Sequence, residues 1–381
     1  MSQPLPRKDR FSVSYSLSAA SRKEAREIAF GICVEQTVEF PYDLIDRAEI
    51  RERIVGRIEA LSAAGQRRYR VEISYADETA GGELTQWLNV VFGNTSLKPA
   101  IRVENLTLSP ALLSIFRGPV FGISGLRRLT RTQRKPRPLV CSALKPMGLS
   151  SRELASLAHC FARGGIDIIK DDHGLSNQPM APFEERVAAC AAAVAEANRE
   201  INGRCLYAPN ITADSEAEAL RRARFAREKG AGALVVSPGL TGMNLVRLLS
   251  AQEDIHLPIF FHPALLGSFT ASPDSGLSHG VLYGQLPRLL GADAVIFPNF
   301  GGRFSSSRAD CRAIAQACRA DLGRIKPILP APGGGMDLPR IPGLSNFYGP
   351  DVIFLMGGGL FRHSPDLVES TRAFRQAIEP G

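Results

Sequence analysis

The chain has 381 residues, of which 44% are hydrophobic and 22% charged, a composition typical of a globular protein. Its length fits one barrel-sized domain and a smaller one. We expect no membrane partner, because no run approaches the roughly 18 apolar residues that a membrane-spanning helix needs. The N-terminus shows no signal peptide, which predicts a cytoplasmic protein. The seven cysteines form no CxxC pair, so we interpret them as reduced core residues.

Basic residues exceed acidic ones, 46 against 38, which gives a formal net charge of +8. The densest basic stretch is residues 127–137, which has no interleaved aromatic residues. We therefore interpret it as a solvated linker and expect no nucleic-acid partner. A positive field would equally attract a phosphorylated substrate.

Residues 1–135 mix helical and strand periodicities, which predicts a small α+β, ferredoxin-like domain with a sheet backed by helices. The expected strands are 11–17, 69–75 and 101–108, and the expected helices are 22–36, 51–64 and 84–92. Ser21 is a suitable N-cap for the first helix. Residues 118–137, rich in Gly, Pro and Arg, are expected to lead into the second domain.

From residue 136 to 381 the sequence alternates short apolar strands with amphipathic helices, and it does so eight times. The expected strands are 139–145, 166–171, 205–211, 233–237, 258–264, 293–299, 327–331 and 352–356. The expected helices are 151–163, 183–199, 215–229, 243–251, 276–290, 307–322, 339–347 and 365–378. Eight such units predict an α/β protein with a (β/α)8 TIM barrel. An open doubly wound sheet would need a glycine-rich dinucleotide fingerprint after its first strand, and none is present.

The barrel places its active site where the strands end, so the polar residues at those positions are candidates. The strand 166–169 is followed by Lys170, Asp171, Asp172 and His173, and four adjacent titratable groups are poor core material. The other strand-end candidates are Lys145, Asn210, His262 and Arg303. A structural reading of Lys170 as an ion-paired loop residue, and of His262 as a core histidine, stays open at this point.

Two glycine triplets end the seventh and eighth expected strands. Gly334 and Gly335 belong to the first triplet, and Gly357 and Gly358 to the second. Barrels commonly bind phosphate in these two loops, because bare backbone N–H groups can approach an anion closely. The triplets therefore predict a phosphate site.

The segment GGIDIIKDDHGLSNQ at residues 164–178 resembles the G-G-x-D-x-x-K-x-D-E motif of the large subunit of ribulose-bisphosphate carboxylase/oxygenase (RuBisCO) and of the RuBisCO-like proteins. The resemblance extends over most of the chain. LKPMGLS resembles the family's first-strand lysine motif, and Gly93-Asn94 its substrate-contacting Gly-Asn pair. CVEQT at residues 33–37 resembles the N-terminal glutamate region, which implies that Glu35 and Asn94 bind substrate.

Several departures argue against CO2 fixation. His173 replaces a metal-binding glutamate, and the first-strand motif lacks the second lysine after Lys145. The loop after the sixth strand carries Arg303 where the resemblance expects a titratable lysine, and arginine does not give up its proton. The resemblance thus implies a form IV type, RuBisCO-like protein that retains only the enolisation half of the chemistry.

For this site the resemblance implies that Lys170 takes up CO2 as a carbamate and binds a divalent ion with Asp172 and His173. The ion would be Mg2+, with Mn2+ or another divalent ion favoured more than usual by the imidazole. Lys145 is the expected general acid/base, helped by His262, while Arg303 and the glycine triplets bind phosphate. We also expect a homodimer whose active site is shared between subunits.

Two substrate classes fit this reading, and a third possibility is a diverged protein with an unknown reaction. Decarboxylation or C–C cleavage of a 3-oxo sugar-acid phosphate, such as 3-oxo-isoapionate 4-phosphate, is slightly favoured. The alternative is a methionine-salvage enzyme, either 5-methylthioribulose-1-phosphate isomerase or diketo-methylthiopentyl-phosphate enolase. From other classes come a Schiff-base aldolase that uses Lys170, and a non-catalytic regulatory relative.

Overall fold

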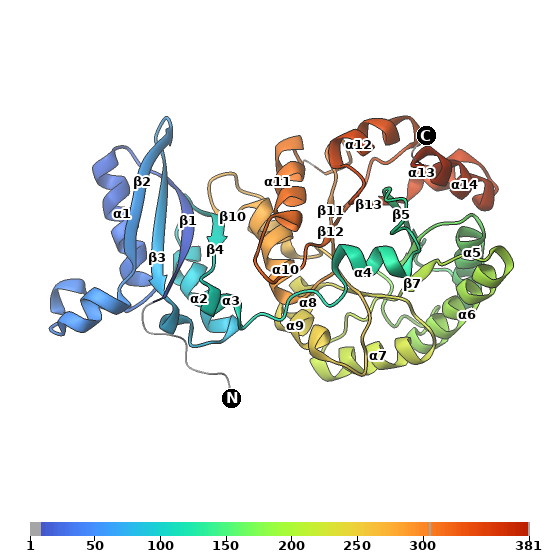
Figure 1. Ribbon diagram of the computed structural model, residues 1–381, viewed down its shortest axis with the longest axis horizontal. Helices are drawn as coiled ribbons and strands as arrows, with labels where there is room; N and C mark the ends of the chain where they lie inside the picture. The colour runs from blue at the N-terminus through green and yellow to red at the C-terminus, as the bar shows by residue number, and fades with distance from the viewer. Residues whose placement is uncertain (1–8, 305, 380–381) are drawn as a thin grey trace. The chain divides into compact units, whose positions relative to one another are not determined.

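The computed structural model describes residues 9–304 and 306–379, which divide into two compact units (Figure 1). One unit comprises the chain up to Phe116 together with Leu266–Gln285. The other comprises Arg117–Leu265 together with the chain from Leu286 onward. Residues 117–135, which the sequence placed with the N-terminal domain, therefore pack with the second unit.

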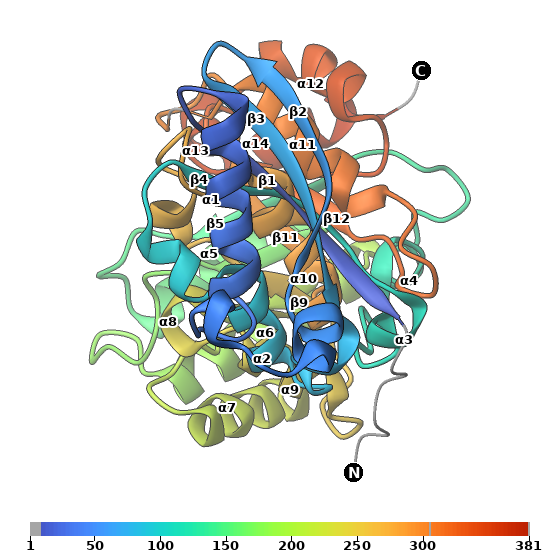
Figure 2. The ribbon, with the colours of Figure 1, turned by 90° about the vertical axis from the view of Figure 1, so that its left-hand side faces the viewer.

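The first unit contains a five-stranded sheet in the order β10-β4-β1-β3-β2. Its strands are β1 (Arg10–Ser18), β2 (Arg57–Gly65), β3 (Arg68–Ala76), β4 (Ile101–Thr107) and β10 (Gly276–Leu277). Strand β1 buries every second residue, as its sequence alternation predicts, and pairs antiparallel with β3 and β4. Helix α1 (Arg22–Glu35), capped by Ser21 as expected, covers one face of the sheet (Figure 2). The unit also contains α2 (Leu84–Phe92) and α3 (Pro110–Leu113).

One helix expected from the sequence is wrong, and a second begins later than expected. Residues 51–64 form the end of a π-helical turn, Ile50–Ile54, and most of the edge strand β2, which pairs with β3. Residues 276–290 begin with β10, which pairs parallel to β4, and the expected helix follows from residue 279, where a π-helical segment (Val281–Gln285) continues into α10 (Leu286–Leu290). Gly276 has φ +90°, and a Cβ there would lie 2.2 Å from the carbonyl oxygen of Phe269. Glycine is therefore required at this turn, which precedes the helix.

The second unit is a (β/α)8 barrel, as expected. Its parallel strands are ordered β7-β6-β5-β13-β12-β11-β9-β8, and the backbone bridge between Asn210 and Val235 closes the ring between β7 and β8. The strands are β5 (Leu139–Leu144), β6 (Ile168–Asp171), β7 (Leu206–Ala208), β8 (Leu234–Val236), β9 (Ile259–Phe261), β11 (Ala294–Pro298), β12 (Leu329–Gly333) and β13 (Ile353–Met356).

Helices surround this barrel on the outside (Figure 1). They are α5 (Ser151–Arg163), α6 (Phe183–Ile201), α7 (Glu216–Glu228), α8 (Pro238–Thr241), α9 (Asn244–Ala251), α10, α11 (Arg308–Arg319), α12 (Ile341–Tyr348), α13 (Gly358–His363) and α14 (Leu367–Ala377). The expected capping box of Ser150 and Glu153 starts α5. None of the helices in the described ranges is both long and apolar enough to cross a membrane.

The basic stretch 127–137 is not the solvated linker that the sequence suggested. It begins within the helix α4 (Gly122–Leu129), whose Leu126 packs into the barrel core. Arg127 is buried and bonds the carboxylate of Asp351 and the carbonyl of Pro350. Arg137 is buried against Asp167. Helix α4 thus closes the barrel at the N-terminal ends of its strands, and part of the positive charge is internal. All seven cysteines are free, and six are buried.

Candidate active site

Residues at the ends of three barrel strands meet at the barrel mouth. The Nζ of Lys145, after β5, lies 3.5 Å from Oδ1 of Asp172, after β6. The same carboxylate oxygen lies 3.7 Å from Nδ1 of His173. The ring of His173 stacks on that of His262, after β9, with centroids 4.5 Å apart. The barrel therefore brings together four of the residues that the sequence singled out.

Lys170 lies beside this group and is only 1% exposed. It belongs to β6, and its Nζ donates a hydrogen bond of 2.6 Å to the carbonyl oxygen of Asp171. Burial lowers the pKa of Lys170 from its ordinary value, and the charge of Lys145 lowers it further, while Asp172 acts in the opposite direction. The net shift favours the neutral amine, which is the nucleophilic form of a lysine.

Asp172 is held in its ionised form. Burial alone would raise the pKa of this carboxyl group, but the adjacent imidazole of His173 and the charges of Lys170 and Lys145 outweigh it. The pKa therefore lies well below its usual range. An ionised carboxylate that remains 26% exposed is a suitable ligand for a divalent cation.

His262 is a buried, neutral imidazole. Burial lowers its pKa to about 2, with further contributions from the charges of Lys170 and His173. The backbone N–H of Ala264 donates to its Nδ1 at 3.2 Å, which assigns the ring proton to Nε2. His262 is thus a weak base at neutral pH and a hydrogen-bond donor through Nε2.

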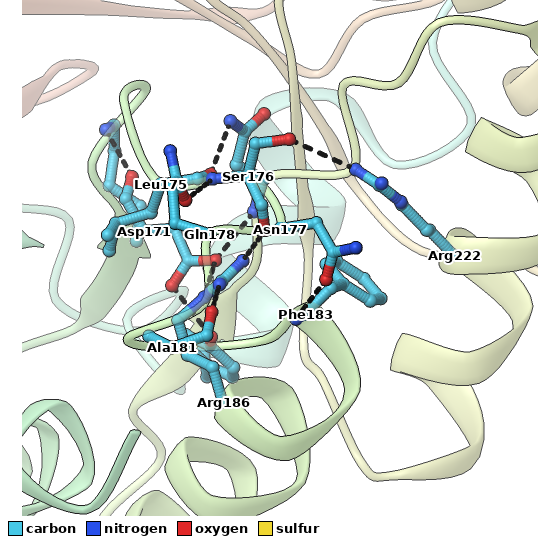
Figure 3. A network of polar contacts seen from close by, with 12 residues as sticks. Asp171, Leu175, Ser176, Asn177, Gln178, Ala181, Phe183, Arg186 and Arg222 are labelled. Atoms are coloured by element: carbon cyan, nitrogen blue, oxygen red, sulfur yellow. Dashed lines mark hydrogen bonds and ion pairs between the residues drawn. The ribbon is translucent and has the colours of Figure 1, made fainter. Parts of the chain in front are cut away.

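A buried network fixes the loop that carries Asp172 and His173 (Figure 3). Asp171 accepts hydrogen bonds from the Nε of Arg186 at 3.1 Å and from the hydroxyl of Tyr207 at 2.8 Å. Arg186 in turn donates to the carbonyl oxygens of Ala181 and Ser176. Both partners of the Asp171–Arg186 pair are fully buried. Asp171 therefore holds the loop in place, and Asp172, its neighbour in the chain, faces the barrel mouth.

Asn210 completes this network. Its side-chain N–H groups donate to the carbonyl oxygens of His173 and Leu175, and its Oδ1 accepts from Thr212. The residue is 1% exposed. In this structure the side chain of Asn210, one of the strand-end candidates from the sequence, holds the loop in place.

The glycine triplet after β12 adopts a shape that requires glycine. Gly334 and Gly335 have φ +91° and +63°. A Cβ at Gly335 would lie 2.8 Å from the Cα of Gly302, in the loop after β11. The guanidinium of Arg340 joins the two loops, because it donates to the carbonyl oxygens of Phe300, Gly301 and Gly335.

The second triplet faces the lysine after β5. A Cβ on Gly357 would lie 3.9 Å from Nζ of Lys145, and Gly358 begins α13 with no atom within 4 Å of its Cβ position. Gly357 and Gly358 therefore leave space for a ligand, whereas Gly359 packs against the carbonyl oxygen of Met336. Arg303 is exposed, and its guanidinium stacks on the ring of Phe304 at 4.9 Å.

Glu35 and Asn94 meet within the N-terminal unit. The side-chain amide of Asn94 donates to Oε1 of Glu35 at 3.1 Å and to Oε1 of Glu39 at 2.9 Å. Gln36 braces this pair, since it donates to the carbonyl oxygens of α2 and accepts from the backbone N–H of Thr95. These residues form one polar cluster at the end of α1.

Sequence reasoning missed several supporting residues. Arg186 and Tyr207 sit inside patterns that read as an ordinary helix and strand, and no local signal shows their partner. Arg340 lies between Asp337 and the helix α12 and resembles a surface residue in sequence. Asn299, after β11, accepts a hydrogen bond of 2.7 Å from Tyr348, and its buried amide nitrogen has no protein partner in the described ranges. Asn299 itself was not missed, because as a polar residue at a barrel strand end it is among the positions that the sequence marks as candidates.

The fold is that of a (β/α)8 barrel, and the candidate active site at its mouth contains two lysines and a carboxylate. Residues 122–380 match the family described as ribulose bisphosphate carboxylase large chain, catalytic domain. The chain therefore belongs to the RuBisCO large-chain family, within which its relatives are RuBisCO-like proteins.

Two relatives cover nearly the whole chain. Ribulose bisphosphate carboxylase-like protein 1 of Rhodopseudomonas palustris is 40% identical over 97% of this chain and 98% of its own length. The 5-methylthioribulose-1-phosphate isomerase of Rhodospirillum rubrum is 40% identical over 97% of this chain and 96% of its own length. The crystal structure of a RuBisCO-like protein from Rhodopseudomonas palustris superposes with a TM-score of 0.87, at 38% identity, over 97% of this chain and 98% of that one.

Proposed function

We propose that this protein is an enzyme that removes a proton next to the carbonyl of a phosphorylated ketose, and that it does not fix CO2. The observation that carries the proposal is the approach of Lys145 to within 3.5 Å of Asp172, beside the buried amine of Lys170. A candidate base, an anionic ligand group and a reactive amine then share one barrel mouth.

The residues present fit a divalent ion. Lys170 as a carbamate, Asp172 and His173 would hold it, and the lowered pKa of Lys170 favours the neutral amine that reacts with CO2. The imidazole of His173 stacks face to face on His262, which leaves its in-plane Nδ1 directed at Asp172. Two oxygen ligands suit Mg2+, and the imidazole nitrogen also suits Mn2+. When bound, the ion would supply a Lewis acid for the substrate carbonyl.

The proton transfer falls to Lys145. Its side chain is 40% exposed, so it can reach a substrate at the mouth, and Asp172 holds its amine in place. His262 is the hydrogen-bond donor of the site, since Nε2 carries its proton and its low pKa prevents charging. This assigns His262 to orienting a substrate oxygen instead of accepting the proton.

The phosphate group would bind to backbone N–H groups of Gly334, Gly335, Gly357 and Gly358. The positive φ values of the first pair and the open space at the last support this role. Arg303 is exposed in the loop after β11 and adds a positive charge that can contact the phosphate. Arg303 cannot replace a titratable lysine, which is why we exclude carboxylation.

A ketose phosphate with an apolar tail is the substrate class we favour. The relative from Rhodospirillum rubrum is named for 5-methylthioribulose 1-phosphate, whose methylthio group is apolar. Two exposed apolar side chains follow barrel strands here, Met147 after β5 at 53% and Leu265 after β9 at 68%. These side chains could contact such a tail.

A 3-oxo sugar-acid phosphate is the second candidate. The cationic groups Lys145, Lys170 and Arg303 suit a substrate that carries both a carboxylate and a phosphate. To separate the two, 5-methylthioribulose 1-phosphate and 3-oxo-isoapionate 4-phosphate would each be incubated with the protein, Mg2+ and bicarbonate, and products followed by NMR. Turnover of neither, with no solvent-proton exchange, would contradict the proposed function.

We also propose that the active site is completed by the N-terminal unit of a second subunit. The resemblance assigns substrate contacts to Glu35 and Asn94, and these side chains already meet in one polar cluster. A homodimer is the smallest assembly that would bring this cluster to the barrel of a partner.

A further inference from the structure

The barrel unit contains a cavity of about 190 Å³ on the face opposite the candidate active site. Its lining includes Ile166 and Asp167, which precede β6, and Cys205, which precedes β7. These residues mark the N-terminal ends of the strands. A cavity of this size holds roughly six waters at about 30 Å³ each, so it has room for a small ion with part of its hydration shell.

Four arginines line this cavity and only one acid does. The arginines are Arg131, Arg137, Arg204 and Arg375, and the acid is Asp167. Arg137 uses both carboxylate oxygens of Asp167, at 2.8 and 2.7 Å. The backbone N–H of Val140 donates to the same carboxylate. Asp167 is therefore committed to its partner, and three guanidinium groups remain without an equivalent anion in the lining.

None of these three arginines is paired with an acid of the lining. Arg131 and Arg204 are exposed, and Arg204 makes no hydrogen bond or ion pair with any residue of the described ranges. Arg375 pairs with Glu379, a carboxylate whose side chain is 57% exposed and does not line the cavity. Burial lowers the pKa of Arg375, the charge of Asp167 opposes this shift, and the charge of Arg137 adds to it. Among the described residues, the guanidinium of Arg131 donates a hydrogen bond to the side-chain oxygen of Asn202, at 3.5 Å.

The C-terminal ends of helices near the cavity explain part of the excess of arginines. Helices α4, α5 and α6 all end at this face, and the C-terminal end of a helix carries a partial negative charge that arginines stabilise. That effect reaches only the last turn, however, and several last-turn carbonyls already bond backbone N–H groups, such as Cys160 with Gly164. The excess of guanidinium groups thus gives the cavity a positive charge that can attract an anion from solution.

We propose that this cavity is a second binding site, for a phosphate group. Arginine forks match the oxygens of phosphate, and the cavity is too small for a large metabolite. Asn202 and the loop before β7 provide further polar groups at its rim. The site is separate from the phosphate loops after β12 and β13, and it does not depend on the proposed reaction.

The test uses the full chain and two double variants. Arg204→Gln with Arg375→Gln removes two of the lining arginines and leaves the Arg137–Asp167 pair intact. Arg152→Gln with Arg199→Gln is the matched control, because it removes the same charge from exposed positions on α5 and α6 outside the lining. Each protein is studied by hydrogen–deuterium exchange with inorganic phosphate, with glycerol phosphate and with succinate, and phosphate binding is measured by equilibrium dialysis.

In the wild type and the control, inorganic phosphate should slow exchange in residues 162–167 and 198–205. In the cavity variant the affinity of this site should fall at least about ten-fold, as expected for lost charge-assisted hydrogen bonds. Equal protection by glycerol phosphate would identify a phosphorylated metabolite as the ligand, and protection by inorganic phosphate alone would identify the free ion. No protection in the wild type, equal loss in both double variants, or equal protection by succinate would each overturn the proposal. Because the readout is local, it does not depend on phosphate binding at the barrel mouth.

Discussion

The state of Lys170 decides whether the barrel mouth can bind a metal ion as proposed. Its amine is buried, and its lowered pKa favours the neutral form. Carbamylation would turn a potential cation into an anionic oxygen ligand next to Asp172. A buried amine that stayed protonated would instead repel the ion.

Lys170→Ala should reduce metal-dependent solvent-proton exchange by at least about 10³-fold, and Lys145→Ala should reduce it by about 10²–10⁴-fold. The two variants should differ in chemical trapping of labelled CO2. Lys145→Ala should retain the trapped carbamate, because it leaves Lys170 in place, whereas Lys170→Ala should not. Equal trapping in both variants would show that the carbamate is on another residue.

His262, at the barrel mouth, should make the free energy of unfolding of the protein depend on pH. Its pKa is lowered to about 2 in the folded protein, while an unfolded histidine titrates near 6.5. Between these values the unfolded chain binds more protons at this residue, so the free energy of unfolding should fall as the pH drops below about 6.5. The slope from one such group is at most about 1.4 kcal/mol per pH unit.

His262→Asn should remove this contribution. Urea unfolding at pH 7.0 and 5.5 should show a smaller loss of stability on acidification for the variant than for the wild type. His159→Asn serves as the control, since His159 lies on α5 beside Glu200, outside the barrel mouth. An identical pH dependence in the wild type and His262→Asn would show that this imidazole charges freely.

At the scale of elements, the loops after β6 and β12 depend on single arginines. Arg186 joins β6, its following loop and α6 through one fully buried guanidinium. Replacing it with methionine leaves the Asp171 carboxylate buried with only Tyr207 and the backbone of Asn210 as donors. Removing one partner of a buried ion pair typically costs about 3–5 kcal/mol.

Arg186→Met should therefore lower the free energy of unfolding by about that amount in urea denaturation. Arg199→Met, on the exposed face of the same helix, should change it by less than about 0.5 kcal/mol. A similar small change in both variants would mean that the Asp171 network adds little to stability.

Arg340 affects a smaller part of the structure than Arg186, because it joins only the two loops that we propose bind phosphate. Arg340→Gln should raise the KM for a phosphorylated substrate about ten-fold, with a smaller effect on kcat, while the melting temperature changes little. Arg362→Gln, exposed near the end of α13, is the matched control. A fall in kcat alone would place Arg340 in the chemistry instead.

The elements also show what sequence patterns can reveal. The barrel strands and the helices α5 and α6 have strong periodicity and caps, so their places followed from the sequence. Residues 51–64 did not, since Glu, Ala and Leu favour a helix locally while β3 recruits them as an edge strand. Gly56 marks the break, because a Cβ there would lie 3.0 Å from the Cα of Cys33 in α1.

Some residues of the candidate site could be predicted from the sequence, and others could not. Lys145, Asp172, His173 and His262 could be named because polar residues at barrel strand ends stand out in sequence. The role of Asn210 could not, because only the folded loop shows that its amide is fully used by backbone groups. Arg186, Tyr207 and Arg340 act through partners that are distant in sequence, and a single chain contains no signal for those pairs.

At the scale of the whole molecule, the proposal requires two subunits for one active site. Asn94→Ala should inactivate the N-terminal cluster, and Lys170→Ala should inactivate the barrel. In a mixture of the two proteins, hybrid dimers would contain one site with neither substitution. Up to about a quarter of the wild-type activity should then return if subunits exchange at random. Subunit exchange shown by mass spectrometry without any recovered activity would contradict a shared site.

The central claim is enolisation without carboxylation, and isotope incorporation tests it most directly. The protein would be incubated in deuterated water with Mg2+, bicarbonate and 5-methylthioribulose 1-phosphate or the 3-oxo acid phosphate, and in parallel with ribulose 1,5-bisphosphate and labelled bicarbonate. We predict metal-dependent deuterium exchange next to the carbonyl of a phosphorylated substrate, which Lys145→Ala abolishes, and no fixed label. Incorporation of labelled carbon into ribulose 1,5-bisphosphate, or the absence of deuterium exchange with every substrate, would contradict the account.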